Sequence, residues 1–481
     1  MFADENIIQN KHEVLYNVAK LAFDGTLEEK RDDIPYIMEK GPKPQFRCCI
    51  YREREITRQR VRLVEGKAPG PIDDGNVIQV ISSACEDCPI SSYVVTDNCQ
   101  NCAGKACINA CKFGAVSQGE KHSKIDASKC RECGQCAKAC PYNAIAHLVR
   151  PCKNACPVDA ITHDEYGLSV IDESKCIRCG QCIHRCPFGA IGSKTFIVDV
   201  INALKSDRPV YAMIAPAAEG QFGDSITMQS WKEAMAKLGF TDTFEVGMGA
   251  DLTTESEAKE WAEAYTAGVK KTTSCCPAFV NMVYKHFPEL KDAVSTTVSP
   301  MCMVSRMIKS KMPEAFTVFI GPCIAKKSEI LDQKLEGNAD ACLTFSEIRA
   351  IMKAKDVTLM PAENIYQDAS VFGKRYAGSG GVTNSVLEYL KETETDFDGQ
   401  VYKANGAAEC KKALLLLKAQ RLPEDFIEGM ACEGGCVGGP SSFAGEQKSK
   451  RDREKMLGCA DCRTIVENLA RIDAGDFNRH R

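Results

Sequence analysis

The sequence predicts two successive regions of different architecture, a cysteine-dense region of small repeated units and then an α/β domain. The first observation is the distribution of the 28 cysteines. Eighteen lie from Cys48 to Cys186, none lies between Cys186 and Cys275, and ten lie from Cys275 onward. The second is that, after Ile191, apolar runs typical of strands alternate with periodic segments typical of helices. This alternation favours helices packed on a sheet.

Composition and charge exclude several classes of protein. The chain has 481 residues, of which 44% are hydrophobic and 26% charged, as in globular domains and unlike disordered or fibrous chains. Lys and Arg number 61 against 65 for Asp and Glu, a net charge of −4 that gives no general reason to expect nucleic-acid or membrane binding. No apolar stretch approaches the roughly 20 residues of a membrane span. We expect neither partner.

The cysteine content also sets the expected compartment. A disulfide scaffold is usually a short secreted chain with a signal peptide. This chain is long, and its first residues, MFADENIIQN, contain neither a basic nor an apolar segment. We therefore expect a reducing cytoplasm, in which thiols stay free or bind metal.

Composition divides the chain into three parts. Residues 1–80 are expected to form an N-terminal extension and linker. Their basic segment at 43–67 is interpreted as a solvated helix or arm, with docking of an acidic electron carrier as the alternative. Residues 66–75, with two prolines and three glycines, resemble a linker. Residues 81–192 are the cysteine-dense region, and residues 193–481 are the α/β domain with a short C-terminal tail.

The cysteine-dense region contains four copies of one repeat. The copies are CINACKFGAV (107–116), CAKACPYNAI (136–145), CKNACPVDAI (152–161) and CIHRCPFGAI (182–191). Two of them carry the full C-x2-C-x2-C-x3-C-P run of bacterial ferredoxins, in which three cysteines bind one cubane and the fourth reaches another cluster. Zinc ribbons instead use two C-x2-C pairs. The region is therefore expected to be α+β and ferredoxin-like, with two units that hold two clusters each.

Sixteen cysteines of this region are candidate ligands. The first copy has C-x2-C-x4-C-x3-C spacing, similar to electron-transfer subunits of multi-cluster oxidoreductases, and the third lacks an upstream pair unless Cys85 and Cys88 supply it. The spacing allows four [4Fe–4S] clusters, or three if those two are free thiols, and the copies could pair in chain order or nested. The candidates are Cys85, Cys88, Cys99, Cys102, Cys107, Cys111, Cys130, Cys133, Cys136, Cys140, Cys152, Cys156, Cys176, Cys179, Cys182 and Cys186.

In the α/β domain, strands are expected at 210–215 and 316–320 and helices at 230–238 and 382–391. Three segments carry a second group of candidate ligands, TSCCPAF (273–279), IGPCIAKKSE (320–329) and EGMACEGGCVGGP (428–440). We infer that four thiols from these distant loops converge on a single cluster, with neighbouring glycines letting backbone approach a bulky inorganic group. The four are Cys276, Cys323, Cys432 and Cys436.

The three segments are similar to the signature motifs of the [FeFe]-hydrogenases, TSCCPxW, MPCxxKxxE and ExMACxxGCxxGGGQP, and the similarity extends from about Val210 to Pro440. It implies an α/β catalytic domain with an H-cluster, a [4Fe–4S] cube joined through a cysteine to a diiron unit bearing CO, cyanide and azadithiolate. By motif position, Cys436 would bridge the cube and the diiron unit, and the other three cysteines would hold the cube. Lys326 would donate a hydrogen bond to a cyanide ligand of the diiron unit. Pro216, Ala217 and Met430 would form the walls of its pocket.

The resemblance also implies a proton path. Cys275 would pass a proton to the bridging amine. The matching positions then run through Glu257, Ser295 and Glu260 to water, with the two glutamates three residues apart on one helix face. For each glutamate, a solvated helix face is the alternative.

The departures from the motifs resemble the group B branch of the family. Gly321 replaces Met, Phe279 replaces Trp, the third motif lacks its GGGQP ending, and Met301 and Cys302 follow Ser-Pro. Cys302 is interpreted as a buried thiol or as a sulfur that approaches and protects the diiron site. Six further cysteines lie outside these sets. Cys459 and Cys462 form a C-x2-C pair that could be a redox dithiol, half of a metal site or idle thiols. No role is expected for Cys48, Cys49, Cys342 and Cys410.

The resemblance therefore implies a ferredoxin hydrogenase that interconverts protons, electrons and H2. Electrons would pass through the accessory clusters to ferredoxin or a similar carrier, and maturation proteins would assemble the H-cluster. The alternatives are an H2 sensor or a subunit of an electron-bifurcating complex, either with the same H-cluster and low turnover, and an iron–sulfur assembly relative. The lysine at 326 and the full proton path argue against the last, which would lack the diiron site.

Overall fold

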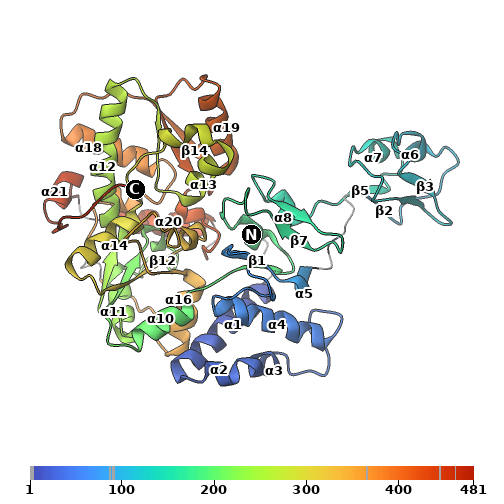
Figure 1. Ribbon diagram of the computed structural model, residues 1–481, viewed down its shortest axis with the longest axis horizontal. Helices are drawn as coiled ribbons and strands as arrows, with labels where there is room; N and C mark the ends of the chain where they lie inside the picture. The colour runs from blue at the N-terminus through green and yellow to red at the C-terminus, as the bar shows by residue number, and fades with distance from the viewer. Residues whose placement is uncertain (1–4, 86–87, 89–92, 364–366, 444–445, 461) are drawn as a thin grey trace.

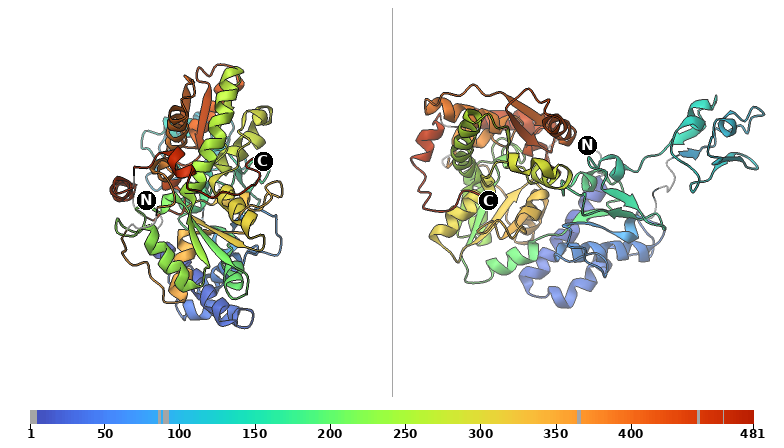
Figure 2. Two further views of the ribbon diagram at one scale, coloured as in Figure 1. Left: turned by 90° about the vertical axis from the view of Figure 1, so that its left-hand side faces the viewer. Right: turned by 45° about the horizontal axis from the view of Figure 1, so that its top comes forward.

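The computed structural model describes residues 5–85, 88, 93–363, 367–443, 446–460 and 462–481. It contains N-terminal helices, two small units and a large α/β domain (Figure 1). We call residues 93–147 the first unit, and residues 78–85 with 151–193 the second unit. The second unit lies between the outlying first unit and the α/β domain (Figures 1 and 2). Within the described ranges, no helix combines the length and apolar character that a bilayer span requires.

The N-terminal helices form a packed layer, whereas the basic segment at 43–67 was expected to be a solvated helix or arm. They are α1 (Glu5–Asp24), α2 (Leu27–Lys30), η1 (Arg31–Asp33), α3 (Ile34–Met38) and α4 (Ile50–Val64). Val18 of α1 and Val61 of α4 share one core cluster with Ile201 of the α/β domain. The arginines of α4 alternate with buried apolar residues. The helix therefore has an apolar face that packs inward, although its overall composition is basic. Residues 66–75, all described, hold neither helix nor strand.

Both small units pair short antiparallel strands beside short helices. In the first unit β2 pairs with β5 and β3 with β4; in the second β1 pairs with β8 and β6 with β7. The first contains β2 (Tyr93–Val95), α6 (Ala106–Asn109), β3 (Val116–Gln118), β4 (Ser123–Ile125), α7 (Gln135–Ala139) and β5 (Ile145–His147). The second contains β1 (Ile78–Val80), α5 (Ser82–Cys85), α8 (Pro151–Asn154), β6 (Ile161–His163), β7 (Ser169–Ile171), α9 (Gln181–Arg185) and β8 (Ile191–Ser193).

The α/β domain is built on two parallel sheets, of strand order β10-β9-β12-β13 and β11-β15-β14. The strands are β9 (Val210–Ile214), β10 (Asp242–Glu245), β11 (Lys271–Thr272), β12 (Phe316–Gly321), β13 (Ala341–Thr344), β14 (Val401–Asn405) and β15 (Phe426–Met430). The expected strands at 210–215 and 316–320 are thus confirmed as β9 and β12. Every residue of β9 and β15 is buried, as parallel sheets covered on both faces require.

Helices cover both sheets, and the expected helices at 230–238 and 382–391 are confirmed as α11 and α18. The helices are α10 (Ile197–Leu204), α11 (Met228–Leu238), α12 (Val246–Thr266), α13 (Pro277–His286), α14 (Pro300–Lys311), α15 (Ala325–Glu329), α16 (Phe345–Ala354), α17 (Val371–Arg375), α18 (Gly381–Glu392), α19 (Ala407–Lys418), α20 (Glu446–Gly458) and α21 (Ile465–Leu469). Short 3₁₀ turns are η2 (Pro216–Ala218), η3 (Pro288–Ala293) and η4 (Cys436–Gly438). The carboxyl ends of β9, β11, β12 and β15 lead directly into the segments that carry the predicted site residues, the usual place for ligands in open α/β sheets.

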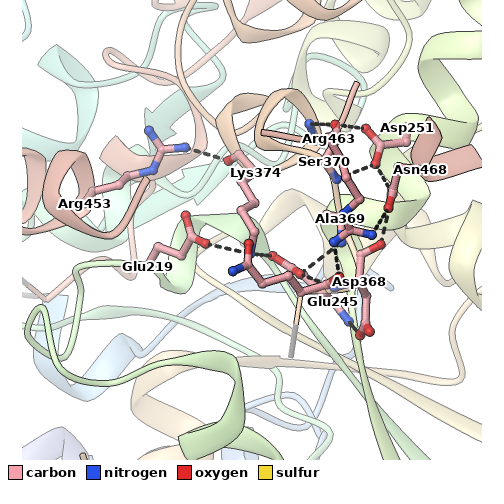
Figure 3. A network of polar contacts seen from close by, with 12 residues as sticks. Glu219, Glu245, Asp251, Asp368, Ala369, Ser370, Lys374, Arg453, Arg463 and Asn468 are labelled. Carbon is pink, nitrogen blue, oxygen red and sulfur yellow. Dashed lines mark hydrogen bonds and ion pairs between the residues drawn. The ribbon is translucent and has the colours of Figure 1, made fainter. Parts of the chain in front are cut away.

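A buried network of ion pairs and hydrogen bonds connects several segments near the carboxyl ends of β9 and β10 (Figure 3). The ammonium of Lys374 on α17 lies 2.5 Å from Glu245 of β10 and 3.3 Å from Glu219. Arg453 of α20 donates to the carbonyl of Lys374 at 2.7 Å. Burial alone would lower the pKa of Lys374, but the two carboxylates outweigh it and raise that pKa. The network ties α17 and α20 to the loop after β9, which places the backbone that follows α17.

Replacing Lys374 by Met should destabilise the fold, because it removes the ammonium that two buried carboxylates share. Breaking one side of a buried ion pair costs about 3–5 kcal/mol. We expect the thermal unfolding midpoint of Lys374→Met to fall clearly. Lys391→Met is the matched control, since that lysine side chain is 78% exposed beside Glu388 and should change the midpoint little. Equal midpoints for the two variants would contradict the bracing role.

Candidate metal centres

One cavity of about 80 Å³ lies at the carboxyl ends of the two sheets, and all four thiols predicted to converge line it. Each thiol comes from a loop that follows a strand: β11 leads to Cys276, β12 to Cys323, and β15 to Cys432 and Cys436. Otherwise the lining is mainly apolar and includes the predicted wall residues Pro216, Ala217 and Met430.

Lys326 brings a single cationic side chain to this lining, as far as the described residues show. Its ammonium donates to Oε2 of Glu329 at 2.5 Å and to the carbonyl of Cys275 at 3.4 Å. Burial opposes the charge, but the carboxylate of Glu329 outweighs it and raises the pKa of Lys326. The cavity therefore presents an ammonium, which suits an anionic group bound beside it.

Two of the departures from the family motifs, Gly321 and Phe279, each pack against a neighbour that fills or leaves open the matching volume. A Cβ on Gly321 would lie 2.8 Å from the ring of Phe319, and that ring lines the cavity. A Cβ on Gly429 would lie 2.4 Å from the ring of Phe279, which is completely buried. Each phenylalanine thus occupies volume that its glycine neighbour leaves open.

Cys302 lies in an apolar core cluster, and it is Met301 that lines the cavity. Burial raises the pKa of the Cys302 thiol to about 12. This placement favours the interpretation of Cys302 as a buried thiol. Cys342 and Cys410 are also buried, whereas Cys48, Cys459 and Cys462 are exposed.

Two smaller cavities of about 20 Å³ each lie in the small units, one in the first unit and one in the second. Each is lined by three cysteines of one copy and the fourth cysteine of the other copy in the same unit. The first cavity has Cys99, Cys102, Cys107 and Cys140; the second has Cys156, Cys176, Cys179 and Cys182. The copies therefore pair in chain order, first with second and third with fourth, and the nested alternative is wrong.

Seven of the other eight cysteines fall into two complementary groups, and the eighth, Cys133, is exposed. Burial raises the pKa of Cys88, and charge at Cys186, Cys152 and Cys85 adds to the shift, so these four sulfurs are neighbours. Burial likewise raises the pKa of Cys136, with Cys111 and Cys130 as charged neighbours. The pair at 85 and 88 thus lies where the third copy lacks its upstream ligands.

The backbone around these thiols suits iron–sulfur clusters. In all four copies the fourth cysteine accepts a hydrogen bond from the backbone N–H four residues later, at 3.2–3.4 Å. Such N–H···S bonds stabilise negative charge on cluster thiolates and help to set the reduction potential. The pairs are Cys111 with Ala115, Cys140 with Ala144, Cys156 with Ala160, and Cys186 with Ala190.

The second unit touches the large cavity through the loop that carries Cys179. Cys179 lines both its own cavity and the large one. The next residue, Gly180, has φ +80°, and a Cβ there would lie 2.8 Å from Ile324, beside Cys323. Glycine therefore permits a close approach between the two sites.

The predicted proton-path residues start at the cavity wall. Cys275 lines the cavity, and Glu257 of α12 is completely buried behind it. Oε2 of Glu257 accepts from the hydroxyl of Tyr376 at 3.3 Å, while Oε1 has no hydrogen-bond partner among the described residues. Burial, reinforced by the charge of Glu260, raises the pKa of Glu257 to about 8. Tyr376 was not among the predicted residues, because nothing in its local sequence indicates contact with α12.

Ser295 and Glu260 continue toward the surface. The hydroxyl of Ser295 is buried and accepts from the backbone N–H of Thr297 at 3.2 Å, which leaves its proton free to be donated. Glu260 is only partly buried and accepts from the N–H of Thr296 at 2.9 Å. In the described part of the chain, no direct hydrogen bond joins Ser295 to either glutamate. Rotation of a side chain or a bridging water is needed to connect them.

Comparison with known families agrees with this arrangement. The family described as "Iron only hydrogenase large subunit, C-terminal domain" matches residues 208–440, and the family described as "4Fe-4S binding domain" matches residues 123–146 and 169–192. The large cavity and the small units thus correspond to an H-cluster domain and to [4Fe–4S] sites.

Individual relatives span most of the chain. It is 27% identical over 407 residues to iron hydrogenase 1 of Clostridium pasteurianum, covering 74% of this chain and 70% of that protein. It is 30% identical over 303 residues to the periplasmic [Fe] hydrogenase large subunit of Nitratidesulfovibrio vulgaris, covering 51% and 72%. It is 26% identical over 490 residues to an NADP-reducing hydrogenase subunit of Solidesulfovibrio fructosivorans, covering 86% and 74%.

The buried carboxyl of Glu257 should titrate far above an ordinary glutamate. With a pKa of about 8, it is protonated below that pH and ionised above it. We expect the infrared difference between wild type and Glu257→Gln to contain a protonated-carboxyl band that disappears with a midpoint near pH 8. Glu263→Gln, an exposed glutamate on the same helix, is the control and should give no such band. A midpoint near 4.5 would contradict the buried environment.

Proposed function

Since the chain belongs to the iron-only hydrogenase family, we propose that it interconverts H2 with protons and electrons in the large cavity. The observation that carries the proposal is the convergence in one lining of the four candidate ligands with Cys275 and Lys326. When bound there, an H-cluster supplies the iron centre at which H2 is made or split. The chain's own residues hold it, exclude water from it and move protons beside it. The departures from the motifs favour the group B branch.

The residue roles follow from where each side chain lies. Cys276, Cys323 and Cys432 would hold the cube, and Cys436 would bridge it to the diiron unit. Lys326 would donate to a cyanide ligand, because its ammonium is held charged at the cavity wall by Glu329. Pro216, Ala217 and Met430 would form the apolar wall that keeps water away.

We propose four accessory clusters arranged as a wire. The two cavities with four cysteines each, together with the further groups of four and three cysteines, support four cluster sites rather than three. Electrons would arrive at the outlying first unit from ferredoxin or a similar carrier and pass through the second unit. Cys179, which lines both its own cavity and the large one, would complete the path.

Proton delivery would use Cys275, Glu257, Ser295 and Glu260 in that order. A carboxyl with a pKa of about 8 suits a relay, since it can both take up and release a proton near neutral pH. The open Oε1 of Glu257 supports this role, because a relay oxygen needs a free position to receive the next hydrogen bond.

A second candidate is the same chemistry within a larger complex. The likeness to an NADP-reducing hydrogenase subunit covers 86% of the chain, which favours a subunit that exchanges electrons with partner proteins. An electron-bifurcating assembly is one such complex. If the chain belongs to one, the isolated chain should turn over H2 slowly, unlike a free-standing hydrogenase. Sensing of H2, cluster loading by maturation proteins and a cytoplasmic location stay predictions from the sequence.

Infrared spectroscopy of protein matured with a diiron precursor tests the proposed function. Wild type should show CO and CN bands and turn over H2. Cys275→Ala should keep the bands and lose turnover, because the thiol that passes the proton is gone. Cys410→Ala, another buried thiol outside the cavity lining, should retain both. Missing CO and CN bands in wild type would refute the H-cluster, and turnover by Cys275→Ala would refute its relay role.

Iron content separates four accessory clusters from three. Fully loaded protein should contain about 22 iron atoms per chain, against about 18 with three accessory clusters. The double variant Cys85→Ser/Cys88→Ser should lower the iron content by about one cluster. Cys48→Ser/Cys49→Ser should leave it unchanged. If the first variant binds as much iron as wild type, the pair at 85 and 88 holds no cluster.

A further inference from the structure

The C-terminal tail is attached along the outer end of the proposed proton path. The N–H of Val298 donates to the carbonyl of Arg479 at 2.9 Å, and the N–H of Arg481 donates to the carbonyl of Thr296 at 2.8 Å. An antiparallel bridge joins Thr297 to His480 between these two bonds. The tail is therefore in strand-like register with residues 296–298, and His480 is fixed beside them.

This register creates a continuous chain of hydrogen bonds from solvent to Glu260. Nδ1 of the exposed His480 ring lies 2.8 Å from the hydroxyl oxygen of Thr296. The same hydroxyl, and the N–H of Thr296, contact the carboxylate of Glu260. A hydroxyl has only one proton. Because the carboxylate takes that proton, the imidazole must be the donor to the Thr296 oxygen.

We propose that His480 is the outermost proton relay of this enzyme, and that it exchanges protons between solvent and Glu260 through the hydroxyl of Thr296. The inference rests on the proposed function. In the inward step, the protonated ring loses its Nδ1 proton to the Thr296 oxygen as the Thr296 hydroxyl proton moves to Glu260. The ring is left neutral and takes another proton from water. H2 oxidation runs the same transfers in reverse.

Surrounding charges hold the relay in place from several elements. Arg306 of α14 donates to the carbonyls of Asn478 and His480 at 2.6 and 2.8 Å, which anchors the backbone on both sides of residue 479. The guanidinium of Arg479 lies 2.6 Å from Glu255 of α12. That of Arg481 donates to the carbonyl of Ser274 at 3.0 Å. Glu260 is the carboxylate that contacts the same Thr296 hydroxyl as the imidazole.

The test compares H2 turnover of matured wild type with His480→Ala at low buffer concentration across a pH series. We expect several-fold slower turnover for the variant, most at high pH where free protons are scarce, with unchanged CO and CN bands. Added imidazole should restore the rate, because it replaces the missing ring. His163→Ala, another exposed histidine in the second unit, should match wild type.

Thr296→Val separates a relay from a merely structural contact. It removes the hydroxyl while keeping the backbone pairing with the tail, so it should also slow turnover at low buffer concentration. If His480→Ala and Thr296→Val both match wild type at every pH, the relay is wrong while the proposed function stands. If imidazole restores nothing to a slowed His480→Ala, the contact is structural. Wild type without CO and CN bands or turnover would overturn both proposals.

Discussion

The arrangement of this protein depends on bringing thiols into buried cavities where they cannot easily ionise. Burial raises the pKa of Cys323 to about 11 and of Cys436 to about 12, and it raises the pKa of Cys179 to about 12 as well. A protonated thiol is a poor ligand, so such sites are useful only when metal ions supply compensating positive charge. Cluster binding and the shape of these cavities are therefore coupled.

Parallel sheets meet this constraint because they bring the ends of distant strands to one place. Three loops bring the four candidate ligands to the large cavity, and the third packs its backbone against the segment that follows α17. Gly435 has φ +77°, and a Cβ there would lie 2.6 Å from the carbonyl of Ala377. The bridge between Gly378 and Gly435 holds that contact, and the network around Lys374 braces the helix just before it. The buried ion pairs of Lys374 thus help to position one wall of the mainly apolar cavity.

The sequence predicted what depends on short spacing or on a recognisable motif, and it missed pairing between distant segments that no motif marks. Cys176, Cys179 and Cys182 are recognisable because a cube needs three thiolates on one tight loop. Nothing local indicates that Cys88 lies beside Cys186, since nearly a hundred residues separate them. For the same reason, His480 could not be connected to Thr296 without the tail's register.

Composition also gave a wrong expectation for a helix whose two faces differ in polarity. The basic segment at 43–67 suggested a solvated arm, yet α4 buries Ile56 and Val61 between its arginines. A count of charges averages over the helix, whereas packing depends on which residues share a face. The proton-path positions escaped this problem only because the family motifs gave their order. Burial and the open oxygen of Glu257 are properties of the folded protein.

Electrons and protons would reach the cavity by separate routes, and the fold keeps those routes apart. The small units lie on one side of the α/β domain, and α12, which carries Glu257 and Glu260, lies on the far side of that domain from them (Figure 1). Cys179 enters the lining from the first direction and Cys275 faces the second. Because the cluster wire needs dry, apolar surroundings and the proton path needs polar groups and access to solvent, combining them would compromise both. The two routes meet at the large cavity. Its lining is mainly apolar, and Lys326 and Cys275 are the residues that would donate a hydrogen bond and a proton there.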